Sequence, residues 1–127
     1  MSDYNSEYNL GVWFDIPVIE LNRAAEFYRI VLKTKVETHD YEEFKFGVFD
    51  HDKGNGGCLV PNEKEISSDK GIMLYLNVNG RIKDAVAQVG KLGGKVLEDI
   101  HPIGPYGFRA VILDSEGNRV VLHSTTN

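Results

Sequence analysis

The sequence predicts an α+β fold in which two tandem βαβββ units form curved, mostly antiparallel sheets around a cavity. Two observations lead to this prediction. First, the same order of elements, a strand, a helix and about three more strands, occurs twice along the 127 residues. Second, identical residues recur 60 positions apart: Val18 and Val78, Leu32 and Leu92, Lys35 and Lys95, Val36 and Val96, and Gly47 and Gly107. Because one such unit covers only one face of its sheet, a second copy is the natural way to bury the rest.

The composition is that of one globular domain. Hydrophobic residues make up 42% of the chain and charged residues 26%, and the net charge is −5. A negative charge argues against nucleic acid as the partner, because phosphate contacts need clustered Lys and Arg. No apolar run approaches the roughly 20 residues of a membrane helix. Cys58 is the only cysteine, so we expect no internal disulfide, and residues 1–9 lack the apolar core of a signal peptide. We therefore expect a cytoplasmic location.

The first unit is expected to span residues 10–61, after a flexible tail at 1–9. Residues 11–18 alternate as a strand does, with Phe14, Ile16 and Val18 facing a core and Trp13 and Asp15 on the other face. A helix follows, because apolar residues then recur at helical spacing: Leu21, Ala24, Ala25, Tyr28, Val31 and Leu32. Further strands are predicted at 35–39, 44–49 and 58–60, and Pro61 ends the last of them.

Residues 62–70 are polar and are expected to form a linker, after which the pattern restarts in a second unit at 71–125. We predict a strand at 72–78 and a helix at 81–92 that Gly93 and Gly94 end. Strands are expected at 95–100, 107–113 and 119–124. Asp114 to Asn118 is predicted to be a turn rather than a site, because Gly and Asn suit left-handed backbone positions.

Several motifs resemble a known family. The opening Ile16-Pro17-Val18, followed by Leu21, Ala24-Ala25 and Phe27-Tyr28, and the closing Asp114-Ser115-Glu116-Gly117-Asn118-Arg119-Val120-Val121-Leu122 are similar to the vicinal oxygen chelate superfamily. This superfamily includes glyoxalase I, extradiol dioxygenases, fosfomycin-resistance enzymes and bleomycin-binding proteins. Tyr75-Leu76-Asn77 and Tyr106-Gly107-Phe108 resemble a glyoxalase-like subtype without an assigned reaction. The resemblance covers about residues 10–125 and implies the fold more strongly than the reaction.

The resemblance also implies four metal-ligand positions on strands that face the cavity. In this sequence they fall on Trp13, Met73 and Val121, and near Leu59, where the register is open by one residue. Indole and aliphatic side chains cannot hold a hard divalent cation, and a thioether is only a soft ligand. We therefore predict that the protein has no cofactor and lacks the family metal.

The leading hypothesis is a binding cavity for a small organic ligand, with aromatic ligands as one class. Trp13 and Tyr75 are expected to supply stacking area, and Asp15, Asn77 and His123 to orient polar groups. The other predicted lining residues are Leu59, Met73 and Val121. In the competing interpretation these large apolar residues simply fill the centre, and Asp15 pairs with a base such as Arg109.

The alternative function is a lyase, isomerase or dioxygenase-type enzyme, and the sequence leaves open whether the protein catalyses a reaction. In one version Asp15 and His123 bind a divalent metal at a shifted site, since each lies two residues along its strand from the implied ligand position. In another version His123 acts as a metal-free base, because imidazole titrates near neutrality. The resemblance also implies a homodimer. Whether the units pair within one chain or between two is left open.

Overall fold

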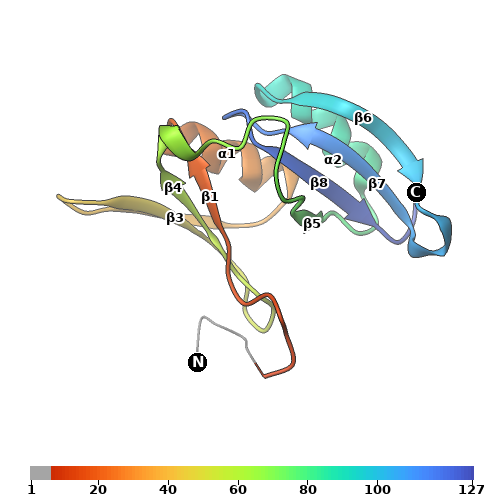
Figure 1. The fold of residues 1–127 in the computed structure, drawn as a ribbon, viewed down its shortest axis with the longest axis horizontal. Coiled ribbons are helices and arrows are strands. Elements are labelled where there is room, and N and C mark those ends of the chain that lie inside the picture. The colour runs from red at the N-terminus through yellow and green to blue at the C-terminus, as the bar shows by residue number, and fades with distance from the viewer. Residues whose placement is uncertain (1–6) are drawn as a thin grey trace.

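The structure, a computed structural model, describes residues 7–127 as two halves with the same order of elements (Figure 1). The first half contains β1 (Asp15–Val18), α1 (Leu21–Val31), β2 (Val36–Asp40), β3 (Lys45–Phe49) and β4 (Cys58–Pro61). The second half contains β5 (Tyr75–Asn77), α2 (Ile82–Val89), β6 (Lys95–Pro102), β7 (Phe108–Leu113) and β8 (Arg119–Ser124). Short 3-10 helices add η1 (Glu63–Glu65) within the predicted linker, η2 (Gly90–Leu92) and η3 (Gly104–Tyr106). Residues 1–6 of the predicted tail lie outside the described residues.

The strands form two four-stranded sheets with the orders β1-β4-β3-β2 and β5-β8-β7-β6. In each sheet the first strand pairs in parallel with the last strand of its unit, and the remaining pairs are antiparallel. This confirms the predicted α+β fold of two βαβββ units. Strand β1 is shorter than predicted, because its partner β4 begins only at Cys58, after the glycine-rich residues 54–57. Trp13 therefore lies just before the strand.

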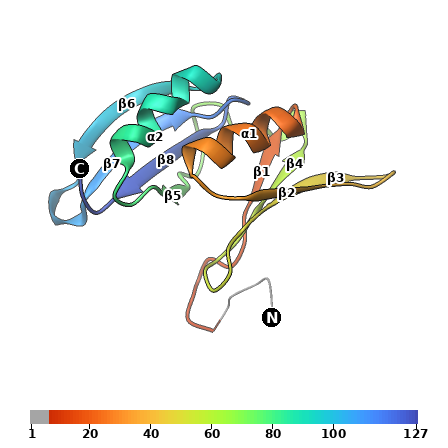
Figure 2. The ribbon, with the colours of Figure 1, turned by 180° about the vertical axis from the view of Figure 1, so that it is seen from behind.

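The apolar stripes predicted from sequence place the two helices. Glu20 caps α1, because its carboxylate accepts hydrogen bonds from the backbone N–H groups of Asn22 and Arg23. Gly93 ends the second helical segment in a left-handed conformation with φ 91°. Figure 2 shows α1 and α2 next to each other on one side of the sheets. One core cluster runs through both units and contains the buried faces of both helices together with strand residues such as Ile16, Leu59, Leu76 and Leu122.

The strand registers show how the two units correspond. Ile16 lies beside Leu59, and Leu59 beside Gly47. In the second unit Leu76 lies beside Leu122, and Leu122 beside Ala110. Because Ile16 and Leu76 are 60 residues apart, the counterpart of Gly47 is Ala110, and the sequence-based pairing of Gly47 with Gly107 is wrong. Three additional residues before β7 shift the later strands of the second unit relative to the first.

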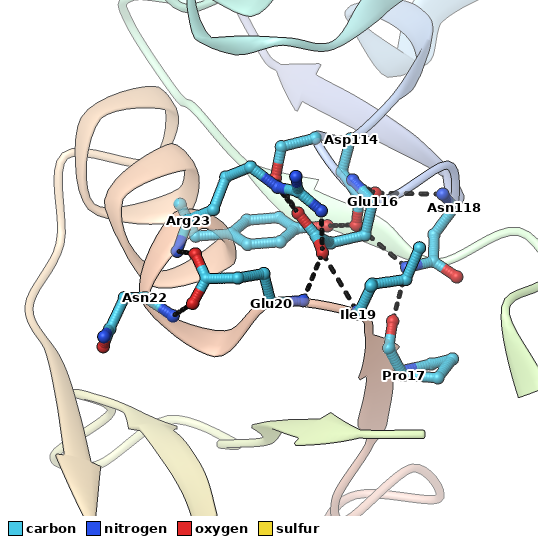
Figure 3. Close-up of polar contacts among 10 residues, drawn as sticks. Pro17, Ile19, Glu20, Asn22, Arg23, Asp114, Glu116 and Asn118 are labelled. Atoms are coloured by element: carbon cyan, nitrogen blue, oxygen red, sulfur yellow. Dashed lines mark hydrogen bonds and ion pairs between the residues drawn. The ribbon is translucent and has the colours of Figure 1, made fainter. Parts of the chain in front are cut away.

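The turn after β7 joins the two units (Figure 3). Glu116, whose side chain is fully buried, accepts hydrogen bonds from the backbone N–H groups of Ile19 and Glu20 and from the Arg23 guanidinium, at 2.7 to 3.0 Å. The Asn118 amide donates to the carbonyl of Pro17 at 2.7 Å. These contacts tie the junction between β1 and α1 to the β7–β8 turn. The predicted turn therefore has a structural role at the seam between the units.

A second part of this hydrogen-bond network joins α1 to Asp114, at the start of the same turn. The buried phenol of Tyr28 donates to Asp114 Oδ2 at 2.6 Å, and Asp114 Oδ1 accepts from the backbone N–H groups of Glu116 and Asn118. Asp114 therefore has hydrogen-bond donors on both carboxylate oxygens, as a buried carboxylate requires.

The Glu116 carboxylate is stabilised in its charged form. Burial alone would raise its pKa, but the hydrogen bonds from Arg23, from the backbone of Glu20 and Ile19, and from Ser115 outweigh burial and bring the pKa to about 2. Arg23 responds in the opposite sense, because its hydrogen bond to Glu116 raises the pKa of the guanidinium. The junction between the units therefore depends on an ionised Glu116.

Within residues 7–127, neither helix has the length and apolar character that crossing a bilayer requires. The predictions of a cytoplasmic location and of no nucleic-acid partner stay predictions.

Candidate functional site

Each sheet has one face that the helices do not cover. On the first sheet, the registers place Asp15, Cys58, Val48 and Glu37 in one row across this helix-free face. On the second sheet, one row contains Tyr75, Val121, Val111 and Glu98, and the next row contains Asn77, His123, Arg109 and His101. The alternation expected for Tyr75, Asn77, Val121 and His123 is therefore what the second sheet shows, and all four share one face.

Trp13 and Asp15 are in contact at the start of β1. The indole N–H of Trp13 donates to Asp15 Oδ1 at 3.2 Å, and the Cys58 thiol donates to the same oxygen at 3.0 Å. The Trp13 ring also packs edge-on against His51, with ring centroids 5.8 Å apart. Among the described residues Asp15 forms no ion pair, and Arg109 binds other groups, so the interpretation of Asp15 as a partner of Arg109 is wrong.

The Cys58 thiol is held in its neutral form. Burial is the main cause, and the hydrogen bond to Asp15 and the negative charge of Asp15 act in the same direction, so the pKa of Cys58 rises to about 12. A thiolate is the form that attacks electrophiles and binds metals. Cys58 is therefore a buried thiol that stays protonated at neutral pH.

A pocket of about 620 Å³ lies between the start of β1, the end of α1 and β5. Trp13 from the first unit and Tyr75 and Asn77 from the second unit contribute to its lining, together with Phe49 and His51. The structure thus brings three of the predicted site residues together at one opening, where aromatic rings alternate with polar groups. Asp15, Met73 and Val121 do not line the pocket. Asp15 accepts a hydrogen bond from Trp13, which does.

The outer edge of this pocket is linked to an arginine. Tyr75 is half-exposed, and its hydroxyl oxygen accepts a hydrogen bond of 2.6 Å from Arg109 Nη1. Arg109 Nε in turn donates to His101 Nε2 at 3.1 Å, while Glu98 lies 4.0 Å from Arg109 Nη2. Residues from β5, β6 and β7 therefore orient one guanidinium beside Tyr75.

His123 lies next to this group. Its ring centroid is 6.2 Å from that of Tyr75, and its Nε2 is 2.8 Å from the carbonyl oxygen of Tyr106. A carbonyl can only accept, so Nε2 carries the proton, and Nδ1 is the acceptor nitrogen of the neutral ring. His123 is therefore oriented in one tautomer.

One predicted site residue is misplaced by one position. Leu59 has no exposed surface and belongs to the core cluster, where it lies beside Ile16 on the helix-covered face. Cys58 takes the corresponding place on the helix-free face, because Asp15 pairs with Cys58 as Tyr75 pairs with Val121. The prediction for Leu59 is therefore wrong, and the counterpart of Val121 in the first unit is Cys58.

The metal that the resemblance implies does not fit the residues present. The four implied positions are now Trp13, Met73, Val121 and Cys58, and the thiol of Cys58 is kept protonated. Within residues 7–127, no three side chains of His, Cys, Asp or Glu gather closely enough to hold a metal ion. Asp15 and His123, the pair considered for a shifted site, each have other partners. The absence of a bound metal stays a prediction.

Sequence reasoning missed Arg109 and His101 as site residues. Period-two alternation along β7 places Arg109 on the same face as Val111, so the pattern could have predicted its position. The position of His101 could not be predicted in this way, because the register of β6 shifts twice, between Val96 and Glu98 and again between Glu98 and His101. Such irregularities change which residues face the site, and alternation no longer predicts them.

Comparison with protein families finds one match, which covers most of the chain. The model of the glyoxalase-like domain family matches residues 12–123. No curated protein is similar enough in sequence to match the chain. Solved structures do match. The hypothetical protein SA1046 from S. aureus is 19% identical, with a TM-score of 0.70, over 91% of this chain and 94% of that one.

Two further solved structures that match are those of named proteins. A glyoxalase/bleomycin resistance protein/dioxygenase family enzyme from Burkholderia phytofirmans PsJN is 15% identical, with a TM-score of 0.68, over 89% of this chain and 96% of that one. A point mutant of the fosfomycin resistance protein FosX from Listeria monocytogenes, complexed with Mn(II) and 1S,2S-dihydroxypropylphosphonic acid, is 14% identical, with a TM-score of 0.67, over 92% of each chain. Identities this low show the fold alone.

Proposed function

Because the chain belongs to the glyoxalase-like domain family, we propose that it binds a small organic molecule, with aromatic compounds as one class, and that it does so without a metal. The observation that carries this proposal is the pocket of about 620 Å³, in which Trp13 meets Tyr75 and Asn77. Its size and its mixture of aromatic and polar lining residues are typical of small-molecule sites. Asp15 contributes by orienting the Trp13 indole, and His123 borders Tyr75.

The metal-free part of the proposal rests on the donor set. The FosX relative is complexed with Mn(II), and hard divalent ions of this kind need oxygen or imidazole ligands. The corresponding positions of this chain offer an indole, a thioether, an aliphatic side chain and a protonated thiol.

We also propose that the protein forms a homodimer. The exposed rings of Tyr41 and Phe44, which contact each other between β2 and β3, support this, because exposed aromatic surface is often covered by a partner.

Native mass spectrometry tests both statements on the purified full-length chain. We expect a mass equal to two chains and no stoichiometric divalent metal after incubation with Mn²⁺ or Zn²⁺ followed by desalting. A bound metal at one equivalent per chain contradicts the metal-free proposal, and a monomer at micromolar concentration contradicts the dimer.

Ligand binding is tested through Trp13. It is the only tryptophan, so its indole N–H gives a single identifiable signal in proton–nitrogen NMR spectra. We expect 2-naphthamide, a neutral aromatic probe, to shift this signal in a saturable way. Tyr75→Ala is expected to weaken binding about tenfold or more, because an aromatic contact is lost. Tyr8→Ala is the control, since Tyr8 is 87% exposed and lies outside the pocket.

Metal-free proton transfer by His123 is the second candidate function. The hydrogen bond from Nε2 to Tyr106 favours it, because the same tautomer leaves Nδ1 as a base. With phenylpyruvate as the probe, Nδ1 would take a methylene proton, the C–H bond breaking to leave an enolate, and return a deuteron from D₂O. We expect His123→Ala to lower the exchange rate at least about a hundredfold, towards the solvent rate. Full exchange in this variant, or none in the wild type, removes the catalytic role.

A further inference from the structure

Arg109 is oriented by uncharged groups. Its Nε–H donates to the imidazole of His101, and one Nη1–H donates to the phenol of Tyr75. His101 Nδ1 lies 2.8 Å from the carbonyl oxygen of Asp99 and therefore carries the ring proton, which leaves Nε2 free to accept from Arg109. The positive charge of Arg109 is thus fixed in place without a carboxylate in hydrogen-bond contact among the residues that the structure describes.

The nearest acidic group leaves this charge largely uncompensated. Glu98 Oε1 is 4.0 Å from Arg109 Nη2, which is too long for a hydrogen bond, and the Glu98 side chain is 55% exposed. An exposed pair at this separation contributes little. The contrast within the molecule is Arg23, which forms hydrogen bonds of 2.7 and 2.9 Å with Glu116. Arg23 therefore stabilises the junction between the units, whereas Arg109 retains N–H groups that can bind a ligand.

Tyr75 and Arg109 together offer hydrogen-bond donors to a ligand. The Tyr75 oxygen accepts from Arg109, so its own O–H is available to donate. The described contacts use two of the five guanidinium N–H groups, and the Arg109 side chain is 23% exposed. Guanidinium and phenol donors side by side match a carboxylate, whose two oxygens accept in one plane.

The surroundings define the rest of the ligand. Tyr75 lines the pocket with Trp13 and also accepts from Arg109, which lies outside the lining, so a ligand that contacts both Trp13 and Arg109 extends from the pocket past Tyr75. Among the described strand residues of the second sheet, the other arginine on this face is Arg119. It donates to the carbonyl of Gly71 and lies four residues from His123 along β8, roughly 13 Å away. Arg109 is therefore the arginine of this face that lies beside Tyr75, and one guanidinium favours a singly charged anion over a dianion such as a phosphonate.

We propose that the ligand is an aromatic carboxylate, that Arg109 and Tyr75 bind its carboxylate group, and that Trp13 contacts its ring. This inference rests on the proposed small-molecule function and narrows it to a ligand class. His101 acts as a positioning residue, because its imidazole accepts a hydrogen bond from Arg109 Nε and so orients the guanidinium.

Two pairs of probes with matched rings test the charge: 2-naphthoate against 2-naphthamide, and benzoate against benzamide. Binding is measured by calorimetry and by the Trp13 indole N–H signal. We expect the wild type to prefer each carboxylate over its amide about tenfold to a hundredfold, because hydrogen bonds to charged groups are the stronger ones. Arg109→Gln is expected to bring this preference to roughly one while the affinity for the amide is unchanged. Tyr75→Phe is expected to reduce it severalfold.

Lys83→Gln is the control, because Lys83 is exposed on α2 and its replacement removes the same charge away from the pocket. It should keep the full preference. Equal affinities of the wild type for carboxylate and amide, or a preserved preference in Arg109→Gln, would overturn the inference and leave the proposed function intact. If none of the four probes moves the Trp13 signal, the proposed function fails and the inference fails with it. If 2-naphthylphosphonate bound more tightly than 2-naphthoate, the preferred ligand class would be a dianion, and the proposal of a carboxylate ligand would be overturned.

Discussion

Replacing Glu116 with glutamine is expected to lower the free energy of unfolding at pH 7 by roughly 3 kcal/mol, which follows from a fall in pKa from 4.5 to about 2. The reason is that the Glu116 carboxylate, in the second unit, satisfies donors of the first unit: the backbone N–H groups of Ile19 and Glu20 and the Arg23 guanidinium on α1. A glutamine keeps one acceptor oxygen but turns an NH₂ group towards the guanidinium. Two donors then face each other, and the one at position 116 is fully buried although Arg23 is half-exposed.

The pH dependence has a definite sign. The folded-state pKa of Glu116 lies below its value in the unfolded chain, so the unfolded state binds the proton more readily. The stabilisation from this residue is therefore fully present above about pH 4.5 and is lost as the pH falls towards 2. We expect the difference between wild type and Glu116→Gln to be constant from pH 5 to 7 and to vanish near pH 2.

Urea unfolding at a series of pH values measures this difference. Glu26→Gln is the matched control, since Glu26 is exposed on α1 and its replacement should change the stability by less than about 0.5 kcal/mol. A Glu116→Gln variant as stable as the wild type at pH 7 would show that the junction does not depend on the charge. A difference that persists at pH 2 would show that packing, and not ionisation, is responsible.

The fold was predictable because its signals are periodic and repeated. The stripe on α1 and the alternation along β8 are local patterns, and β8 has the predicted bounds. The 60-residue offset between Trp13 and Met73 or Asp15 and Tyr75 survives in the structure, because both units begin with the same strand and helix. It fails at Gly47, since loop lengths before the later strands differ and a fixed offset cannot follow them.

The site was predictable only in part, for two physical reasons. Trp13, Tyr75 and Asn77 share a pocket, as alternation along the first strand of each unit predicted. The interaction of Arg109 with Tyr75 joins β7 to β5, and such contacts between strands distant in sequence depend on register, which alternation alone does not supply. Cys58 and Leu59 illustrate the same limit, because a strand of four residues after a glycine-rich loop gives too few positions to fix its phase.

Replacing Leu59 with alanine tests that register directly, and we expect a loss of about 2–5 kcal/mol in the free energy of unfolding. Leu59 has no exposed surface and lies in the core cluster, so its truncation leaves a cavity under α1. Cys58→Ala, one position earlier, is expected to cost about 1 kcal/mol or less, because a single sulfur atom is removed from the helix-free face. The two neighbouring truncations therefore differ in effect although the residues adjoin.

The second unit supplies the matched control. Leu122 lies beside Leu76 as Leu59 lies beside Ile16, and it is equally buried, so Leu122→Ala should resemble Leu59→Ala in urea unfolding. Because Leu59 does not line the pocket, the residual folded protein should bind 2-naphthamide with the wild-type affinity at low urea. If Cys58→Ala proved the more destabilising change, or if Leu59→Ala altered ligand binding without altering stability, the register would be the one first predicted from sequence. Leu59 would then face the site, and the comparison of Cys58 with Val121 would no longer hold.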